Sequence, residues 1–154
     1  MNKDRLKEFV NALDALSDDV KDMDVEMGNT NKPSCGTPGC HAGLISIVAK
    51  DLPELQDIYE CLYFLQWNIR GSRYEYSIWA DALAVFLGFK NMRDLRDWAK
   101  DNPKLWGNRS GYNLFCSRLA FIDDAYEQLT HRDIINHWKQ VLVNLGTIKE
   151  YDYE

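Results

Sequence analysis

The residues with the greatest capacity for chemistry lie together in residues 34–43, with the sequence SCGTPGCHAG. Two thiols and an imidazole fall within seven residues, directly ahead of an apolar stretch with helical spacing. A glycine-rich turn before a helix can bind an anion, because the first backbone N–H groups of a helix have no partner within it. Cysteine and histidine are also ligands of zinc, and a cysteine thiolate is a nucleophile. This segment is therefore the first candidate site.

Two interpretations of the turn require neither a metal nor a reactive thiol. In the simplest one, Cys35 and Cys40 are small buried apolar residues, and the glycines provide a tight turn that positions the helix after it. In the second, Thr37 and the backbone N–H groups around Gly36 and Gly39 bind a phosphate or nucleotide. The segment has neither the P-loop pattern nor the dinucleotide fingerprint, so helix-terminus geometry is the only support for this binding.

The other two interpretations use the side chains as reactive groups. Cys35, Cys40 and His41 would bind zinc if a further ligand came from Cys61, Cys116, His131 or His137. Alternatively, Cys40 would act as a nucleophile with His131 or His137 as its base, but no oxyanion signature supports an enzyme. We expect free thiols, no metal, no cofactor and no catalytic residues. The ligand-binding candidates are Cys35, Gly36, Thr37, Gly39, Cys40 and His41.

A second segment, residues 101–108 (DNPKLWGN), is a candidate contact with a partner. An exposed Trp106, with Asn108 beside it, would anchor another protein, because aromatic anchors dominate the energetics of interfaces. The alternative is that Trp106 folds back onto the core between Trp98 and Phe115, as aromatic side chains usually do.

The charge of the chain restricts its partners. The net charge is -6 and the pI is about 5.1. No basic stripe is present, which disfavours direct binding of duplex nucleic acid. Acids are concentrated at Asp14, Asp18, Asp19, Asp22, Asp24 and Glu26, and again at Glu150, Asp152 and Glu154. These acids form either a solvated surface or an acidic face for a basic protein partner.

The elements that must position these segments are helices. Apolar residues recur with helical spacing over residues 3–17, 42–52, 53–67, 76–87, 92–98, 115–129 and 130–145. In the 53–67 helix, the stripe includes Leu62 and Leu65, and Tyr63 and Phe64 widen it, so we expect much of this helix to be buried. The predicted core includes Phe9, Leu13, Leu62, Trp79, Leu83, Phe115, Leu119, Ile135, Trp138 and Leu142.

Local signals mark several helix ends. Asn91 resembles an N-cap, and Thr130 with Asp133 resembles a capping box. Gly88 and Gly146 suit the left-handed residue after a helix. Residues 18–39 are predicted to be a loop with a short extended piece at Met23, Val25 and Met27, and residues 101–111 are predicted to be a second loop.

These patterns predict one mainly α-helical domain over residues 1–154, a compact irregular bundle of six or seven helices with at most a small strand element in its first third. Residues 1–7 lack the pattern of a signal peptide, and no apolar stretch reaches the length of a membrane span. We therefore expect a cytoplasmic protein with reduced thiols that does not bind a membrane.

The turn also resembles a motif of uncharacterised bacterial and bacteriophage proteins, Cys-Gly-Thr-x-x-Cys-x-Ala-Gly. The matching residues are Cys35, Gly36, Thr37, Cys40, Ala42 and Gly43, followed farther on by Ala84, Leu87, Gly88, Phe89, Leu114 and Phe115. The resemblance implies a phage or prophage accessory protein and carries no activity with it. The expected function is non-catalytic binding of a host macromolecule, such as inhibition of a defence factor. The alternative is a small-ligand binder that uses residues 35–43.

Overall fold

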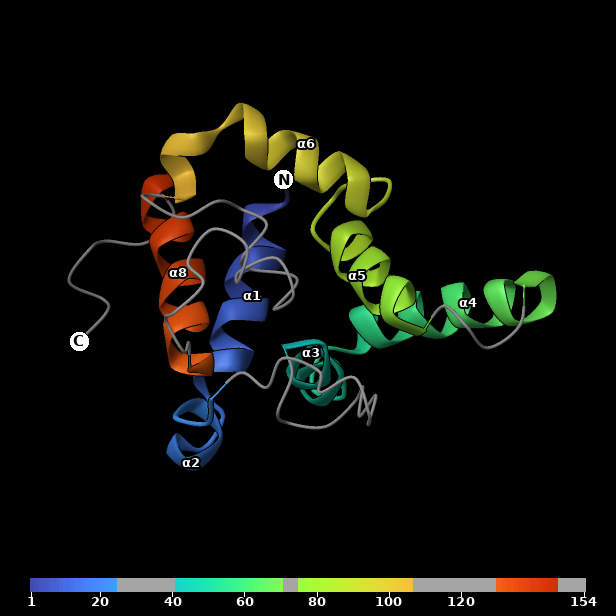
Figure 1. The fold of residues 1–154 in the computed structure, drawn as a ribbon, viewed down its shortest axis with the longest axis horizontal. Coiled ribbons are helices and arrows are strands. Elements are labelled where there is room, and N and C mark those ends of the chain that lie inside the picture. Colours follow the sequence, from blue (N-terminus) through green and yellow to red (C-terminus); the bar gives the residue numbers. More distant parts are fainter. Residues whose placement is uncertain (25–40, 71–74, 107–129, 147–154) are drawn as a thin grey trace.

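The computed structural model describes residues 1–24, 41–70, 75–106 and 130–146. In these residues the chain is helical, as predicted, and the only β-type pairing is an isolated bridge between Asp24 and Thr130. The elements in chain order are α1 (Lys3–Asp14), α2 (Asp18–Lys21), α3 (His41–Ala49), α4 (Pro53–Arg70), α5 (Glu75–Phe86), α6 (Met92–Asp101), the 3₁₀ helix η2 (Pro103–Trp106) and α8 (His131–Asn144). Figure 1 shows their arrangement.

The first and last of these helices, α1 and α8, lie side by side (Figure 1). The apolar stripe of α1 is buried at Leu6, Phe9, Val10 and Leu13. The ring of Phe9 meets the indole of Trp138 edge-on, with centroids 5.6 Å apart and planes at 88°. Edge-to-face pairs of this kind contribute about 0.5–1.5 kcal/mol beyond the burial of their area. The pair therefore joins segments from opposite ends of the chain.

Helix α5 is the second centre of the core. Its Leu83 and Phe86, and Leu87 directly after its end, are fully buried, and it packs against α3, α4 and α6. Gly88 follows with φ of +92°, and the N–H groups of Gly88 and Phe89 donate to the carbonyls of Val85 and Ala84 at 3.0 and 2.9 Å. This is a Schellman ending, which satisfies carbonyls that have no partner inside the helix.

The predicted caps of α6 and α8 are present. The Asn91 side chain accepts from the Asp94 N–H at 3.0 Å. The Thr130 hydroxyl accepts from the Asp133 N–H at 3.3 Å, and the Asp133 carboxylate accepts from the Thr130 N–H at 2.9 Å. Asp therefore replaces the usual Glu in a reciprocal capping box.

The structure differs from the sequence predictions in two loops. Residues 18–21 form the short helix α2, capped by Ser17, and residues 103–106 form η2. Of the predicted extended piece, Val25 and Met27 lie outside the described residues, as does the predicted 115–129 helix.

Most of the predicted core residues whose side chains the structure describes are buried. Phe9, Leu13, Leu83, Ile135, Trp138 and Leu142 belong to the core, and Leu62 is half-buried against it. The side chains of Trp79, Phe115 and Leu119 lie outside the described part of the chain. Within the described helices, none combines the length and apolar character that a membrane span requires.

Candidate functional site

The residues of the predicted binding turn lie mostly outside the described part of the chain. This applies to Cys35, Gly36, Thr37, Gly39 and Cys40. The helix that the turn was predicted to precede is present: α3 begins at His41, although the described structure does not extend to the His41 side chain. The predicted contact residue Asn108 also lies outside, and Trp106 is described only as the last backbone position of η2.

Of the additional residues named for a zinc site, Cys61 lies on α4, His131 and His137 lie on α8, and Cys116 is outside the described residues. Cys61 is exposed on α4, whereas His131 is fully buried at the first position of α8, where its N–H donates to the Met23 carbonyl at 3.1 Å. Among the described residues, no group of three or more His, Cys, Asp or Glu side chains is arranged to hold a metal ion. Cys35 and Cys40 lie outside the described residues, so zinc binding by residues 35–41 stays a prediction.

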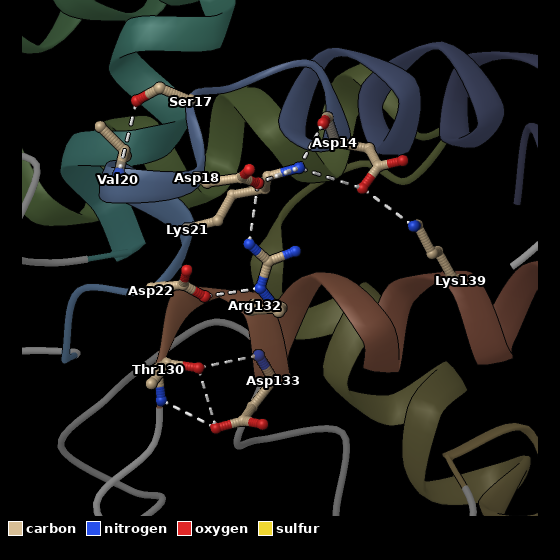
Figure 2. A network of polar contacts seen from close by, with 10 residues as sticks. All are labelled: Asp14, Ser17, Asp18, Val20, Lys21, Asp22, Thr130, Arg132, Asp133 and Lys139. Carbon is tan, nitrogen blue, oxygen red and sulfur yellow. Dashed lines mark hydrogen bonds and ion pairs between the residues drawn. The ribbon is translucent and has the colours of Figure 1, made fainter. Parts of the chain in front are cut away.

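A cluster of charged side chains joins α1 and α2 to α8 (Figure 2). Arg132 of α8 reaches two carboxylates: its Nε lies 2.6 Å from Asp22 Oδ1, and its Nη2 lies 3.0 Å from Asp18 Oδ1. One helix turn of α2 separates these two acids, so both face the same guanidinium. A planar fork with several N–H donors suits this double contact.

Two lysines complete the cluster through Asp14. The Lys139 Nζ from α8 lies 2.9 Å from Asp14 Oδ1. The Lys21 side chain is largely buried, and its Nζ donates to the Asp14 carbonyl at 2.8 Å while lying 3.7 Å from the carboxylates of Asp14 and Asp18. The backbone carbonyl and the two carboxylates together compensate for the burial of this ammonium group.

The electrostatics follow from these contacts. Hydrogen bonding from Arg132 lowers the pKa of Asp18, and the positive charge of Lys21 lowers it further. The same arginine lowers the pKa of Asp22, chiefly through its hydrogen bond, and the two acids raise the pKa of Arg132. The two hydrogen bonds of Arg132 favour the charged form of each partner. Asp18, Asp22 and Arg132 are therefore charged at neutral pH.

This charged cluster changes the interpretation of the acidic N-terminal segment. Three of its acids, Asp14, Asp18 and Asp22, are neutralised by three bases of the same chain, of which two come from α8. Their contacts hold helices together. These three carboxylates are therefore poorly placed to serve as an acidic face for another molecule.

A different surface exposes large apolar side chains to solvent. On α4, the Phe64 side chain is 67% exposed and the Leu65 side chain is 49% exposed, and Cys61 beside them is also exposed. Glu60 and Asp57 are also exposed, about one and two turns nearer the start of the helix than Phe64. Residues spaced by three or four positions lie on one side of a helix. We call this side the α4 outer face and define it by Asp57, Glu60, Cys61, Phe64 and Leu65.

The exposure of Phe64 and Leu65 corrects the expectation that this stretch is buried. Helix α4 has 18 residues and α5, its main neighbour, has 12. At about 1.5 Å per residue, α4 spans about 27 Å and α5 about 18 Å, so α5 covers only part of α4. Figure 1 shows α4 extending away from α1 and α8. The opposite side of α4 does reach the core, through Leu55, Ile58, Tyr59 and Leu62.

The start of α4 is fixed by a contact with α1. The Arg5 guanidinium forms an ion pair with Glu54, donates to the Phe86 carbonyl at 3.0 Å and lies 5.3 Å from the centroid of the Phe86 ring. Within α4, the Gln56 amide donates to Glu60 at 2.8 Å. These contacts tie the start of α4 to the body of the protein, and the α4 outer face continues outward from there.

The sequence contains a signal for this surface that the apolar stripe alone does not reveal. Residues 61–65 read CLYFL, so five consecutive apolar positions occupy all sides of the helix. A helix that is apolar all round must be covered on every side or carry an exposed apolar surface. The second case applies here.

Comparison with protein-family models, with curated proteins and with solved structures finds no match to this chain. The function has to be inferred from the residues themselves.

Proposed function

We propose that this chain is a non-catalytic accessory protein that acts by binding another protein. The observation that carries the proposal is the exposure of Phe64 and Leu65 on a helix that extends beyond its neighbours. Both an aromatic and an aliphatic side chain contribute strongly to the free energy of binding when a partner covers them. Grouped exposure of large apolar residues often indicates an interaction site.

The biological setting belongs to the same proposal. The resemblance of Cys35–Gly36–Thr37 and Cys40 to a motif of bacterial and bacteriophage proteins supports a phage or prophage origin. An accessory protein of that kind would act in the cytoplasm on a host protein, for example by inhibiting a defence factor. A net charge of -6 favours a protein partner over duplex nucleic acid.

The test uses a variant in which the exposed apolar pair is made polar. The Phe64→Ser/Leu65→Ser protein and the wild type are each purified from the native host and compared by native mass spectrometry. We expect the wild type to retain a protein partner and the variant to lose it. The circular dichroism spectrum should be unchanged, because both side chains are substantially exposed.

A matched control is Met23→Ser, because Met23 is the other large apolar residue exposed in the described structure, at 39%. This variant should keep the partner. If the Phe64→Ser/Leu65→Ser variant retains the partner at the wild-type level, the proposal is refuted.

A second candidate function is small-ligand binding by residues 35–43. The observation in its favour is that α3 begins at His41, so the turn leads directly into the N-terminus of a helix. Native mass spectrometry of the same preparation would reveal a retained phosphate compound, nucleotide or metal. About one zinc per chain, lost in Cys35→Ser/Cys40→Ser, would favour this function over protein binding. The two thiols would then hold the metal, and its binding would be coupled to folding.

A further inference from the structure

We infer that the partner presents a basic amphipathic helix to the α4 outer face. This inference rests on the proposed function and specifies the chemistry of the partner. The surface offers two features in a fixed order along one helix, acids first and apolar side chains after them. A partner that complements both features must carry positive charge and apolar groups in the corresponding order.

The charge on this surface has one sign. From Pro53 to Leu65, α4 contains Glu54, Asp57 and Glu60 and no Lys, Arg or His. Glu54 is already paired with Arg5, so the acids of the outer face itself are Asp57 and Glu60. The net charge of -6 adds a long-range field of the same sign. Complementary charge steers association and selects among partners, so a basic segment is favoured over an acidic or neutral one.

The same pattern argues against a second copy of this chain as the occupant. If two copies paired their outer faces in parallel, Asp57 and Glu60 of one copy would meet the same acids of the other. If the helices paired antiparallel, these carboxylates would lie against the apolar end of the partner helix. The first arrangement is repulsive, and the second desolvates charges without pairing them.

The spacing defines the complementary sequence pattern. Glu60 lies about one turn before Phe64, and Asp57 lies about two turns, or about 10 Å, before it. A helix laid along this face would place an apolar pair over Phe64 and Leu65, with Lys or Arg one and two turns away. Recognition by side chains at helical spacing is a common mode of binding between a helix and a protein surface.

The test uses two synthetic peptides of roughly 20 residues, long enough to form a helix. Both carry the same apolar stripe; one has two Lys at the positions described above, and the other has two Glu. We expect the full chain to bind the Lys peptide at least about tenfold more tightly, as two exposed ion pairs replace two repulsions. Asp57→Lys/Glu60→Lys should reverse this preference, and Phe64→Ser/Leu65→Ser should abolish binding of both peptides.

The matched control for charge reversal is Asp97→Lys/Asp101→Lys, which changes two exposed acids with the same kind of helical spacing on α6. This variant should keep the preference of the wild type. The preference should also weaken as salt rises from about 0.05 to 0.5 M, because exposed charges are screened.

Each other outcome refutes a specific part of the inference. Equal affinity for the two peptides, still dependent on Phe64 and Leu65, would refute a basic partner and leave protein binding by this face intact. Absence of binding to either peptide, or binding unaffected by the serine variant, would overturn the docking site. A dimer in sedimentation that the serine variant disperses would identify a second copy as the occupant. Binding to phosphatidylcholine vesicles that the serine variant loses would identify a membrane surface. The proposed function fails separately, when the serine variant keeps its host partner.

Discussion

The stability of the fold should depend sharply on Leu83, whose side chain is fully buried in the core. Replacing Leu83 with Ala removes three carbon atoms, and at about 0.8 kcal/mol for each carbon the transfer term alone is about 2.4 kcal/mol. Helix α5 packs against three other helices, α3, α4 and α6, which limits how far they can move to fill the space. Adding the cavity term gives an expected loss of about 3–4 kcal/mol in the free energy of unfolding, within the range for buried leucines.

The same substitution at Leu65 is the matched control, because that side chain is 49% exposed on α4. We expect Leu65→Ala to cost about 1 kcal/mol or less. Urea unfolding followed by circular dichroism at 222 nm gives both values, provided that the slopes of the three proteins agree. A loss below about 1 kcal/mol for Leu83→Ala, or equal losses at the two positions, would refute the assignment of the α5 face to the core.

Three further predictions concern the helix ends and the charged cluster that joins α1 and α2 to α8. Because the pKa values of Asp18 and Asp22 lie below the ordinary 3.8 in the folded chain, their stabilising effect is complete above about pH 4 and is lost as the pH falls through the lowered values. Asp18→Asn/Asp22→Asn should therefore be less stable than the wild type at pH 7, with a difference that shrinks in acid; thermal unfolding between about pH 7 and pH 2.5 measures it, and a constant difference would contradict the assignment. Gly88→Ala should cost about 2–3 kcal/mol, because φ is +92° and the added Cβ would lie 3.3 Å from the Asn2 backbone nitrogen. Gly146→Ala, with φ of +68° and no atom within 4 Å, should cost only about 1 kcal/mol in chemical denaturation, and equal costs would refute the contact with Asn2. Thr130→Ala should lower the stability by about 1 kcal/mol in the same assay through loss of the capping box, and an unchanged stability would show that the cap contributes nothing.

Features determined by residues close in sequence were predicted best. The capping box of Thr130 and Asp133, the cap at Asn91 and the left-handed Gly88 all depend on positions within a few residues of each other, and all three are confirmed. Helix α2 also had a local signal, since Ser17 is a favourable N-cap. It was missed because the surrounding acids were interpreted as a loop.

Features determined by distant residues could not be predicted. Nothing near Asp22 in the sequence indicates that Arg132, 110 residues later, will bind it. The exposure of Phe64 also depends on elements that its own sequence neighbourhood does not determine. Periodicity shows which side chains are apolar, but the length of the neighbouring helix decides which of them are covered. The candidate turn around Cys35 and Cys40 lies outside the described residues, so that part of the site stays a prediction.

The pairing of α1 with α8 has a consequence for synthesis of the protein in the cell. Ribosomes add about 5–20 residues per second, so the 110 residues between Asp22 and Arg132 take roughly 5–20 s to make. Throughout that interval the apolar stripe of α1 lacks α8, one of the helices that pack against it. Nascent chains of this protein should therefore bind a holdase chaperone through residues 3–14 until α8 is released, and translation of the last third sets the earliest time at which the native fold can form.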